Sequence, residues 1–240
     1  EFGLDVPNDL LKRHIFEFSE NPQLAYYHFT KQIEKSLIEK NKMRKYRILD
    51  NGARIGENVI LGENVEIEPL VFIDHDCQIG DHVYLGAGSI IRRAKIGDHV
   101  QIAEQVLIGA DGYNLVEESQ YLYSMPTLGK VEIGHGAVIG SKTIISAGLA
   151  GLTEISEYAQ IDSGCHIHHD CQIGKNVELC SHVIMGGFTV IKNHAFIGIG
   201  TQIKNRIIIG ESAMIGMGSV VIHNIPDKGR AYGVPARLIE

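Results

Sequence analysis

The sequence predicts an all-β solenoid, a parallel β-helix of about eight coils with a short N-terminal helical segment and one external loop. Between residues 153 and 221 every sixth residue is a long aliphatic, and a smaller side chain lies two residues before each one. Gly often follows the aliphatic. The aliphatics are Ile155, Ile161, Ile167, Ile173, Leu179, Met185, Ile191, Ile197, Ile203, Ile209, Ile215 and Val221.

This period excludes a long α-helix, because a 3.6-residue turn would spread the aliphatics around the whole cylinder. It fits a short strand whose two inward positions hold the small and the large residue, followed by a corner where Gly or Asn relieves backbone strain. Three corners close a triangular coil of about 18 residues, and coils stack about 4.8 Å apart as parallel strands.

Composition fits one such domain. A chain of 240 residues that is 44% hydrophobic can bury one sizeable core. The net charge of −7 argues against nucleic acid as the main partner. We see neither a membrane span nor a secretory signal, and so expect a cytoplasmic protein. Because the chain begins with Glu1 rather than Met, residues upstream are left open.

The cysteines indicate packing. Cys77, Cys165 and Cys171 occupy the small inward position, and no CxxC pair occurs. We interpret these three as reduced core residues, with no metal or disulfide framework.

The chain divides into three parts. Residues 1–47 lack the period, and we expect a short helix over 9–18 and a longer one from about Pro22 to Lys42, with Pro in the first turn. Residues 48–224 form the β-helix and 225–240 a C-terminal tail. We interpret the N-terminal segment as a cap on the first coil, with substrate binding or subunit bridging as alternatives.

Three irregularities interrupt the ladder, and the first is the deletion of one residue before Ile96. Residues 110–130 lack the period and carry Glu117 and Glu118, so they must loop outward. Long loops on a rigid scaffold usually carry function. A slip of four residues follows at 148–151.

One corner is rich in histidine. Ile167 points inward, so His166 and His168 point outward, and His169 lies at the turn followed by Asp170. An imidazole is a natural general base, and a carboxylate beside it can orient the ring and stabilise its charged form. The alternative is that these are solvated corner histidines without a catalytic role. Such corner histidines also occur at His82, His99, His182 and His194.

The next coil brings further groups to the same corner. A step of about 18 residues leads from His169 to Gly187 and then to Asn205. Gly187 clears space beside the base and exposes an N–H group. Lys204 and Arg206 flank Asn205 and suit phosphates, although a solvated basic corner fits them equally.

The repeats resemble the hexapeptide-repeat acyltransferases. Residues 108–113, 125–134 and 161–174 are similar to UDP-3-O-acylglucosamine N-acyltransferases, and the run Asn-Pro-Gln-Leu-Ala at 21–25 is similar to a motif of the same family. The His169–Asp170 pair also resembles UDP-N-acetylglucosamine O-acyltransferases. The ending at 233–237 is similar to coenzyme A–using sugar acetyltransferases.

This resemblance implies a left-handed β-helix and a homotrimer with active sites between subunits. It implies catalysis by His169, Asp170 and the N–H of Gly187, which would bind the thioester oxyanion. We expect transfer of a short acyl group, such as acetyl, from acyl-CoA to the amine of a UDP- or dTDP-linked sugar, with no bound cofactor. We assign acceptor binding to Asp111, Tyr113, Asn114 and His166, and donor binding to Lys204, Asn205, Arg206, Gly218 and Arg237.

Departures from the family keep alternatives open. The N-acyltransferases of the family have a uridine-binding domain upstream and a helical tail that binds acyl carrier protein, and neither is visible in this sequence. The Asp-Arg-Gly sequence of those enzymes is replaced here by Ser146-Ala147-Gly148. The alternatives are a carrier-protein-dependent lipid A-type N-acyltransferase, a zinc enzyme similar to γ-class carbonic anhydrases, and a trimeric scaffold. The zinc alternative is disfavoured because no second histidine lies five residues before His168 or His169.

Overall fold

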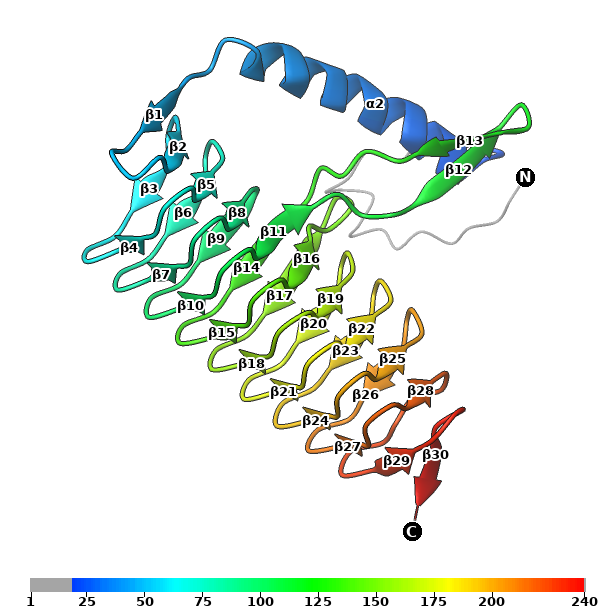
Figure 1. The fold of residues 1–240 in the computed structure, drawn as a ribbon. Helices are drawn as coiled ribbons and strands as arrows, with labels where there is room; N and C mark the ends of the chain where they lie inside the picture. The colour runs from blue at the N-terminus through cyan, green and yellow to red at the C-terminus, as the bar shows by residue number, and fades with distance from the viewer. Residues whose placement is uncertain (1–18, 240) are drawn as a thin grey trace, which may run out of the picture.

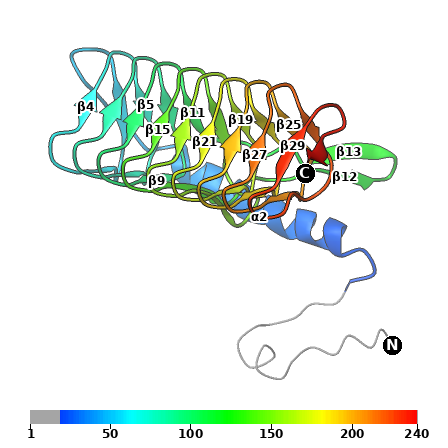
Figure 2. The same ribbon diagram turned by 90° about the horizontal axis from the view of Figure 1, so that it is seen from below.

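The computed structural model describes residues 19–239, which form a parallel β-helix with one helix and one hairpin projecting from it (Figure 1). The predicted helix over 9–18 lies outside the described residues. Coils stack along a single axis, as the second view shows (Figure 2). No helix within 19–239 has the length and apolar character needed to cross a membrane.

Each coil contributes one strand to each of three faces, and the fold is most easily followed face by face. The first face consists of β1 (Tyr46–Ile48), β2 (Arg54–Gly56), β5 (Phe72–Ile73), β8 (Ile90–Ile91), β11 (Leu107–Ala110), β16 (Ile144–Ser146), β19 (His166–Ile167), β22 (Ile184–Met185), β25 (Gln202–Ile203) and β28 (Val220–Val221).

The other two faces follow the same pattern. The second face consists of β4 (Glu66–Ile67), β7 (Tyr84–Leu85), β10 (Gln101–Ile102), β15 (Val138–Ile139), β18 (Gln160–Ile161), β21 (Glu178–Leu179), β24 (Phe196–Ile197), β27 (Met214–Ile215), β29 (Arg230–Tyr232) and β30 (Arg237–Ile239). The third face consists of β3 (Ile60–Leu61), β6 (Gln78–Ile79), β9 (Ala94–Ile96), β14 (Lys130–Ile133), β17 (Leu152–Ile155), β20 (Gln172–Ile173), β23 (Val190–Ile191) and β26 (Ile208–Ile209).

The predicted β-solenoid is confirmed, but its coil count is too low. Two faces hold 10 strands and the third holds 8, so the solenoid has about ten turns rather than about eight. The difference arises at the ends, where β1, β29 and β30 extend two faces without a hexapeptide aliphatic. Both β1 and β30 pair antiparallel with their neighbours, whereas the coils pair in parallel.

The aliphatic ladder forms one continuous core. Ile167 pairs with Ile145 in the preceding coil and with Met185 in the next one, and all three are fully buried. Stacking in register lets each aliphatic touch the same type of side chain above and below, which gives dense packing.

The interpretation of the cysteines as core residues is confirmed. Cys77, Cys165 and Cys171 are buried, and all four cysteines are free. Burial raises the pKa of the Cys77 and Cys165 thiols to about 11 and that of Cys171 to about 12. These thiols therefore remain protonated and serve packing.

The glycines after the aliphatics have a different role from the one predicted. The left-handed backbone falls two residues later, on residues such as Asp170 (φ 57°) and Phe188 (φ 61°). A Cβ at Gly198 would instead lie 2.5 Å from the backbone nitrogen of Met217 in the next coil. Glycine is needed there for the close approach of stacked backbones.

The insertion forms a hairpin that packs on the N-terminal helix. Strands β12 (Leu115–Glu118) and β13 (Tyr121–Ser124) pair antiparallel, and α2 (Pro22–Asn41) lies against them. The Gln23 side chain donates to the Leu115 carbonyl at 3.1 Å, and Tyr27 is buried against Val116 and Met125. The helix therefore packs on the hairpin, and β1, rather than the helix, pairs with the first coil.

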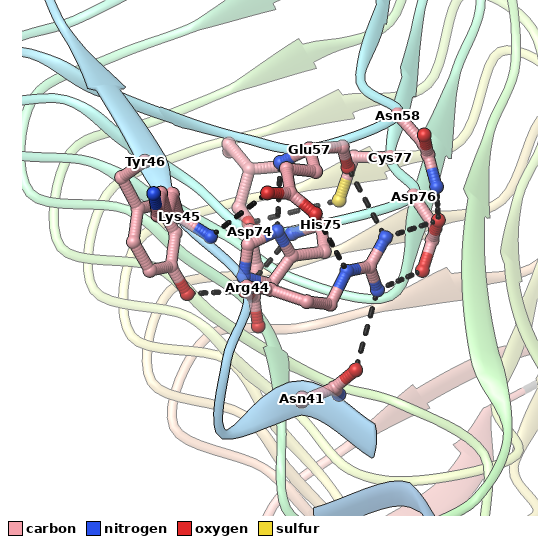
Figure 3. A network of polar contacts seen from close by, with 11 residues as sticks. Asn41, Arg44, Lys45, Tyr46, Glu57, Asn58, Asp74, His75, Asp76 and Cys77 are labelled. Atoms are coloured by element: carbon pink, nitrogen blue, oxygen red, sulfur yellow. Dashed lines mark hydrogen bonds and ion pairs between the residues drawn. The ribbon is translucent and has the colours of Figure 1, made fainter.

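A polar network fixes the other end of the helix (Figure 3). The guanidinium of Arg44 donates to both carboxylate oxygens of Asp76, at 2.5 and 2.8 Å, and its side chain is only 10% exposed. Hydrogen bonding to Arg44 holds the pKa of Asp76 well below its usual range. Tyr46 donates to Asp74 at 2.8 Å. The helix is thus anchored at the first coils and at the hairpin.

Candidate active site

The histidine-rich corner lies between the first and third faces, where the chain leaves β19 and turns into β20. Ile167 is buried in the core, and Asp170 takes the left-handed conformation that makes the turn. Asp is among the few residues that tolerate this conformation. The turn brings His169 and Asp170 side by side over the corner.

His169 and Asp170 form a dyad. The ring Nδ1 of His169 lies 2.9 Å from Asp170 Oδ2, and the two side chains are only 10% and 13% exposed. The same oxygen accepts the Leu149 N–H at 3.1 Å, and the Asp170 N–H donates to Thr153 Oγ1 at 2.8 Å. The carboxylate is therefore held on Nδ1, which leaves Nε2 to accept a proton.

Gly187 lies directly against the imidazole. A Cβ at this position would be 2.6 Å from His169 Cε1 and 2.8 Å from Nε2, so any side chain would displace the ring. The Gly187 carbonyl accepts the Arg206 N–H at 3.0 Å, while no acceptor within residues 19–239 takes its own N–H. A free N–H beside a base is suited to bind a developing oxyanion.

The dyad opens onto a cleft that combines polar and aromatic groups. The Phe188 ring packs edge-on against His169 at 5.2 Å, and the Arg206 guanidinium lies 4.5 Å above Phe188. The lining residues are Tyr113, Asn114, His168, His169, Gly187, Phe188, Asn205 and Arg206.

Arg93 holds the two ends of the insertion together beside this cleft. Its guanidinium donates to the Gly109 carbonyl at 2.6 Å and to the Thr127 carbonyl at 3.0 Å. The Gly112 N–H donates to Thr127 Oγ1 at 2.8 Å, and Gly112 packs against His169. Because both ends of the insertion are held, Tyr113 and Asn114 have fixed positions at the cleft.

Tyr26 of helix α2 is influenced by the charge of the dyad. Its side chain is half-buried against the cluster of Tyr27, Val116 and Met125. Burial raises the pKa of the Tyr26 hydroxyl, and the negative charge of Asp170 raises it further.

Not every residue assigned from the sequence reaches the cleft of this chain. Asp111 has an exposed side chain that pairs with Arg93 at 2.6 Å, and the His166 ring stacks on His168 at 4.2 Å. Lys204 is exposed outside the lining. Gly218 lies at the corner between the second and first faces, and Arg237 on β30 at the end of the second face.

Three contributing residues escaped the sequence reading. Phe188 lies one coil above Asp170, so the 18-residue step could have found it. Leu149 and Thr153 hold Asp170 by hydrogen bonds. The four-residue slip marked the region of Leu149, but only coordinates show which N–H group it presents.

The histidines do not assemble with other ligands. Across residues 19–239 no group of three or more His, Cys, Asp or Glu side chains is arranged to hold a metal ion. The His166 and His168 rings stack nearly parallel, at 18°.

Comparison with known proteins agrees with the repeats and the fold. The family "Bacterial transferase hexapeptide (six repeats)" matches residues 58–93, 76–110 and 153–187. A UDP-3-O-acylglucosamine N-acyltransferase of Caulobacter sp. is 30% identical over 152 residues, 63% of this chain and 45% of that protein. An acyl-[acyl-carrier-protein]–UDP-N-acetylglucosamine O-acyltransferase of Campylobacter concisus is 28% identical over 177 residues, 72% of this chain and 65% of that protein.

Solved structures give the same picture. The UDP-N-acetylglucosamine acyltransferase of Campylobacter jejuni matches with a TM-score of 0.62 and 29% identity, over 81% of this chain and 74% of that one. The Francisella novicida enzyme of the same name, at 23% identity, matches with a TM-score of 0.72 over 80% of this chain and 68% of that one, and shares the fold. The chain therefore has the repeat and the β-helix of the hexapeptide-repeat acyltransferases, and that resemblance is confirmed. The chain spans less than two thirds of the length of the two curated relatives named above.

Stability should fall in mild acid because of the stacked histidines. Burial lowers the pKa of both His166 and His168, so the folded protein favours their neutral forms. The two neutral rings contribute fully to the free energy of unfolding above about pH 6.5, which is the ordinary pKa of histidine. This contribution is lost as the pH falls through their lowered pKa values. We expect a lower melting temperature at pH 5.5 than at pH 7.5, and a smaller loss in a His166→Asn, His168→Asn double variant. The matched control is the exposed pair His82→Asn, His99→Asn, which should keep the wild-type loss; equal losses in all three proteins would contradict this.

Proposed function

We propose that the chain is an acyltransferase that moves a short acyl group, such as acetyl, from acyl-CoA to the amine of a nucleotide-linked amino sugar. The observation that carries this proposal is the His169–Asp170 dyad beside the N–H of Gly187, which has no acceptor among the residues that the structure describes. The names of the two relatives describe acyl transfer to UDP-linked sugars, which supports the same class of chemistry.

Each member of the site has one step in this reaction. As the acceptor nitrogen attacks the thioester carbonyl, Nε2 of His169 removes its proton, and Asp170 stabilises the imidazolium that results. The carbonyl oxygen becomes negative and binds the Gly187 N–H. When the intermediate collapses, the C–S bond breaks and the thiolate takes the proton from His169. The products are an amide and coenzyme A.

The donor is proposed to bind along the corner above His169. Asn205 and Arg206 line the cleft one coil further, and Lys204 precedes them, so phosphates of coenzyme A would meet amide and cationic donors there. None of the eight lining residues has an aliphatic side chain, which favours a short acyl group. Gly218 lies at another corner and Arg237 on the second face, so both would meet the donor only from a neighbouring subunit.

The acceptor is proposed to bind on the insertion side. Tyr113 and Asn114 face the dyad across the cleft, and the sequence also assigns Asp111 and His166 to this role. The amine would have to lie within reach of Nε2 for proton transfer. Because acyl-CoA and nucleotide sugars are metabolites of the cytoplasm, we propose that the protein acts there.

The first face favours a homotrimer that completes the site. Most outward positions of this face hold apolar side chains. On the other two faces the outward positions hold a mixture of apolar, charged and amide side chains. An extended exposed apolar stripe usually marks an interface. The outward apolar residues are Phe72, Ile90, Leu107, Ile144, Ile184 and Val220.

A second candidate is a lipid A-type enzyme that uses an acylated carrier protein. The name of the Campylobacter concisus relative, which includes the carrier protein and an O-acyl product, favours it. An acidic carrier needs a basic docking surface, whereas this chain has a net charge of −7. We therefore keep acyl-CoA as the proposed donor.

The role of His169 is tested by substitution. His169→Ala should fold normally and lower turnover by about 10²- to 10⁴-fold, the usual contribution of a positioned base. Asp170→Asn should cost less, since a partly neutral amine can attack unaided. His135→Ala is the matched control, because His135 precedes the left-handed residue of another corner as His169 does, and it should keep full turnover. Near-normal turnover in His169→Ala would assign His169 to binding alone.

The donor is tested by ligand-induced stabilisation. Coenzyme A, acetyl-CoA, UDP and dTDP are added separately while the melting temperature is recorded. A ligand at 100 times its Kd contributes about 2.7 kcal/mol, which is large enough to detect. We expect coenzyme A to stabilise the wild type and Arg206→Ala to lose the shift. No shift with millimolar coenzyme A, together with turnover supported by an acylated carrier protein, would favour the second candidate.

The assembly is tested by sedimentation. We expect a trimer at micromolar concentration, and a monomer for Ile184→Lys, because a buried unpaired cation opposes the interface. Gln160→Lys, at the equivalent outward position of the second face, is the control and should remain trimeric. A wild-type chain that sediments as a monomer would remove the inter-subunit site from the proposal.

A further inference from the structure

We propose that the four-residue slip at 148–151 is a positioning device for the His169–Asp170 dyad. Its two parts are the backbone N–H of Leu149 and the absence of a side chain at Gly151. This inference rests on the proposed role of His169 as a general base, and concerns how its carboxylate partner is aimed.

The slip first removes Asp170 from the regular hydrogen-bond pattern of the corner. One and two coils above Asp170, the corner N–H groups of Phe188 and Arg206 donate to the carbonyls of His169 and Gly187, each at 3.0 Å. The equivalent acceptor for Asp170 would be the Gly151 carbonyl. That carbonyl instead accepts the Lys130 N–H at 3.1 Å, and the Asp170 N–H donates to Thr153 Oγ1.

The slip then supplies a donor to the carboxylate. The N–H of Leu149 donates to Asp170 Oδ2 at 3.1 Å, and the same oxygen lies 2.9 Å from His169 Nδ1. Two partners on one oxygen fix the plane of the carboxylate and favour the tautomer with the proton on Nδ1. Hydrogen bonds to an ionised oxygen are stronger than those between neutral groups.

Gly151 leaves room for the other carboxylate oxygen. A Cβ at Gly151 would lie 3.0 Å from Asp170 Oδ1, and would meet no other atom of the described chain within 4 Å. At Gly148 a Cβ would lie 2.8 Å from the same oxygen but also 2.6 Å from the backbone of Gly151. A methyl group at Gly151 therefore presses on the carboxylate alone.

The segment 125–129, which follows β13 and leads into β14, holds the slip in place. The Leu128 N–H donates to the Leu149 carbonyl at 2.7 Å, and the Gly129 N–H donates to the Gly148 carbonyl at 3.0 Å. The segment that carries Tyr113 and Asn114 to the cleft thus also braces the donor to Asp170. We infer that this contact couples the position of the insertion to the orientation of the His169–Asp170 dyad.

The test uses Gly151→Ala and reads the tautomer of His169 directly. Nitrogen chemical shifts of imidazole-labelled protein distinguish a proton on Nδ1 from one on Nε2, and a His169→Asn variant assigns the signal. We expect the Nδ1 tautomer in the wild type and a mixture in Gly151→Ala. Gly200→Ala is the glycine control: its Cβ would meet no described atom within 4 Å, but its φ of 68° strains any side chain. It therefore reports backbone strain away from the dyad, and should keep the wild-type signal. An unchanged signal in Gly151→Ala would overturn the proposal.

Turnover gives a second readout. Gly151→Ala should lower kcat roughly 10- to 100-fold through misplacement of the base, with KM changed by less than about twofold. In an Asp170→Asn background the same substitution should cause no further loss, because both changes act through one carboxylate. Additive losses would show a general structural role instead. A tautomer change in a protein that transfers no acyl group would overturn the proposed function and leave the positioning device standing.

Discussion

Closure of each coil around the buried aliphatic ladder is the constraint on which the rest of the structure depends. Ile145, Ile167 and Met185 stack in register with no exposed surface, so an extra or missing residue on a face would move its whole inward set. Irregular chain is therefore confined to the corners. The chemistry of the protein follows this rule, since the dyad and its neighbours all lie at or beside one edge.

Three departures from the period meet at that edge. A one-residue deletion places Arg93 at its corner, where it clamps the insertion. The insertion leaves after Gly109 and returns along the four-residue slip. The slip in turn donates to Asp170. Each departure alone would only weaken the coil, because it interrupts the backbone ladder. Together they satisfy one another and enclose the imidazole.

Much of this could be predicted from the sequence, and the limit is physical. The period of six specifies inward positions, so the solenoid, the core and the cysteines follow from it. The 18-residue step aligned His169, Gly187 and Asn205, and the same arithmetic would have placed Gly218 on another edge. The hairpin was beyond reach, since its register depends on packing against α2 rather than on a repeat. The glycines were assigned a conformational role, because close approach of two coils leaves no local signal.

Helix α2 shows how the site and the scaffold are joined. An isolated helix of 20 residues is marginal in water, and only Tyr27 and Thr30 of this one are buried. Its stability must therefore come from its ends, the hairpin at one and the Arg44–Asp76 pair at the other. An Arg–carboxylate pair of which the arginine is largely buried resists screening better than an exposed pair.

The hairpin that holds the helix is also linked to the dyad. The chain that leaves the hairpin after Ser124 runs through Leu128, whose N–H donates to the Leu149 carbonyl. A ligand that moved the hairpin would therefore act on Asp170 through the slip. Because the aliphatic ladder cannot yield, such a movement would be expressed at the corner and nowhere else. The rigidity of the coil thus confines any response to binding to the residues that hold His169.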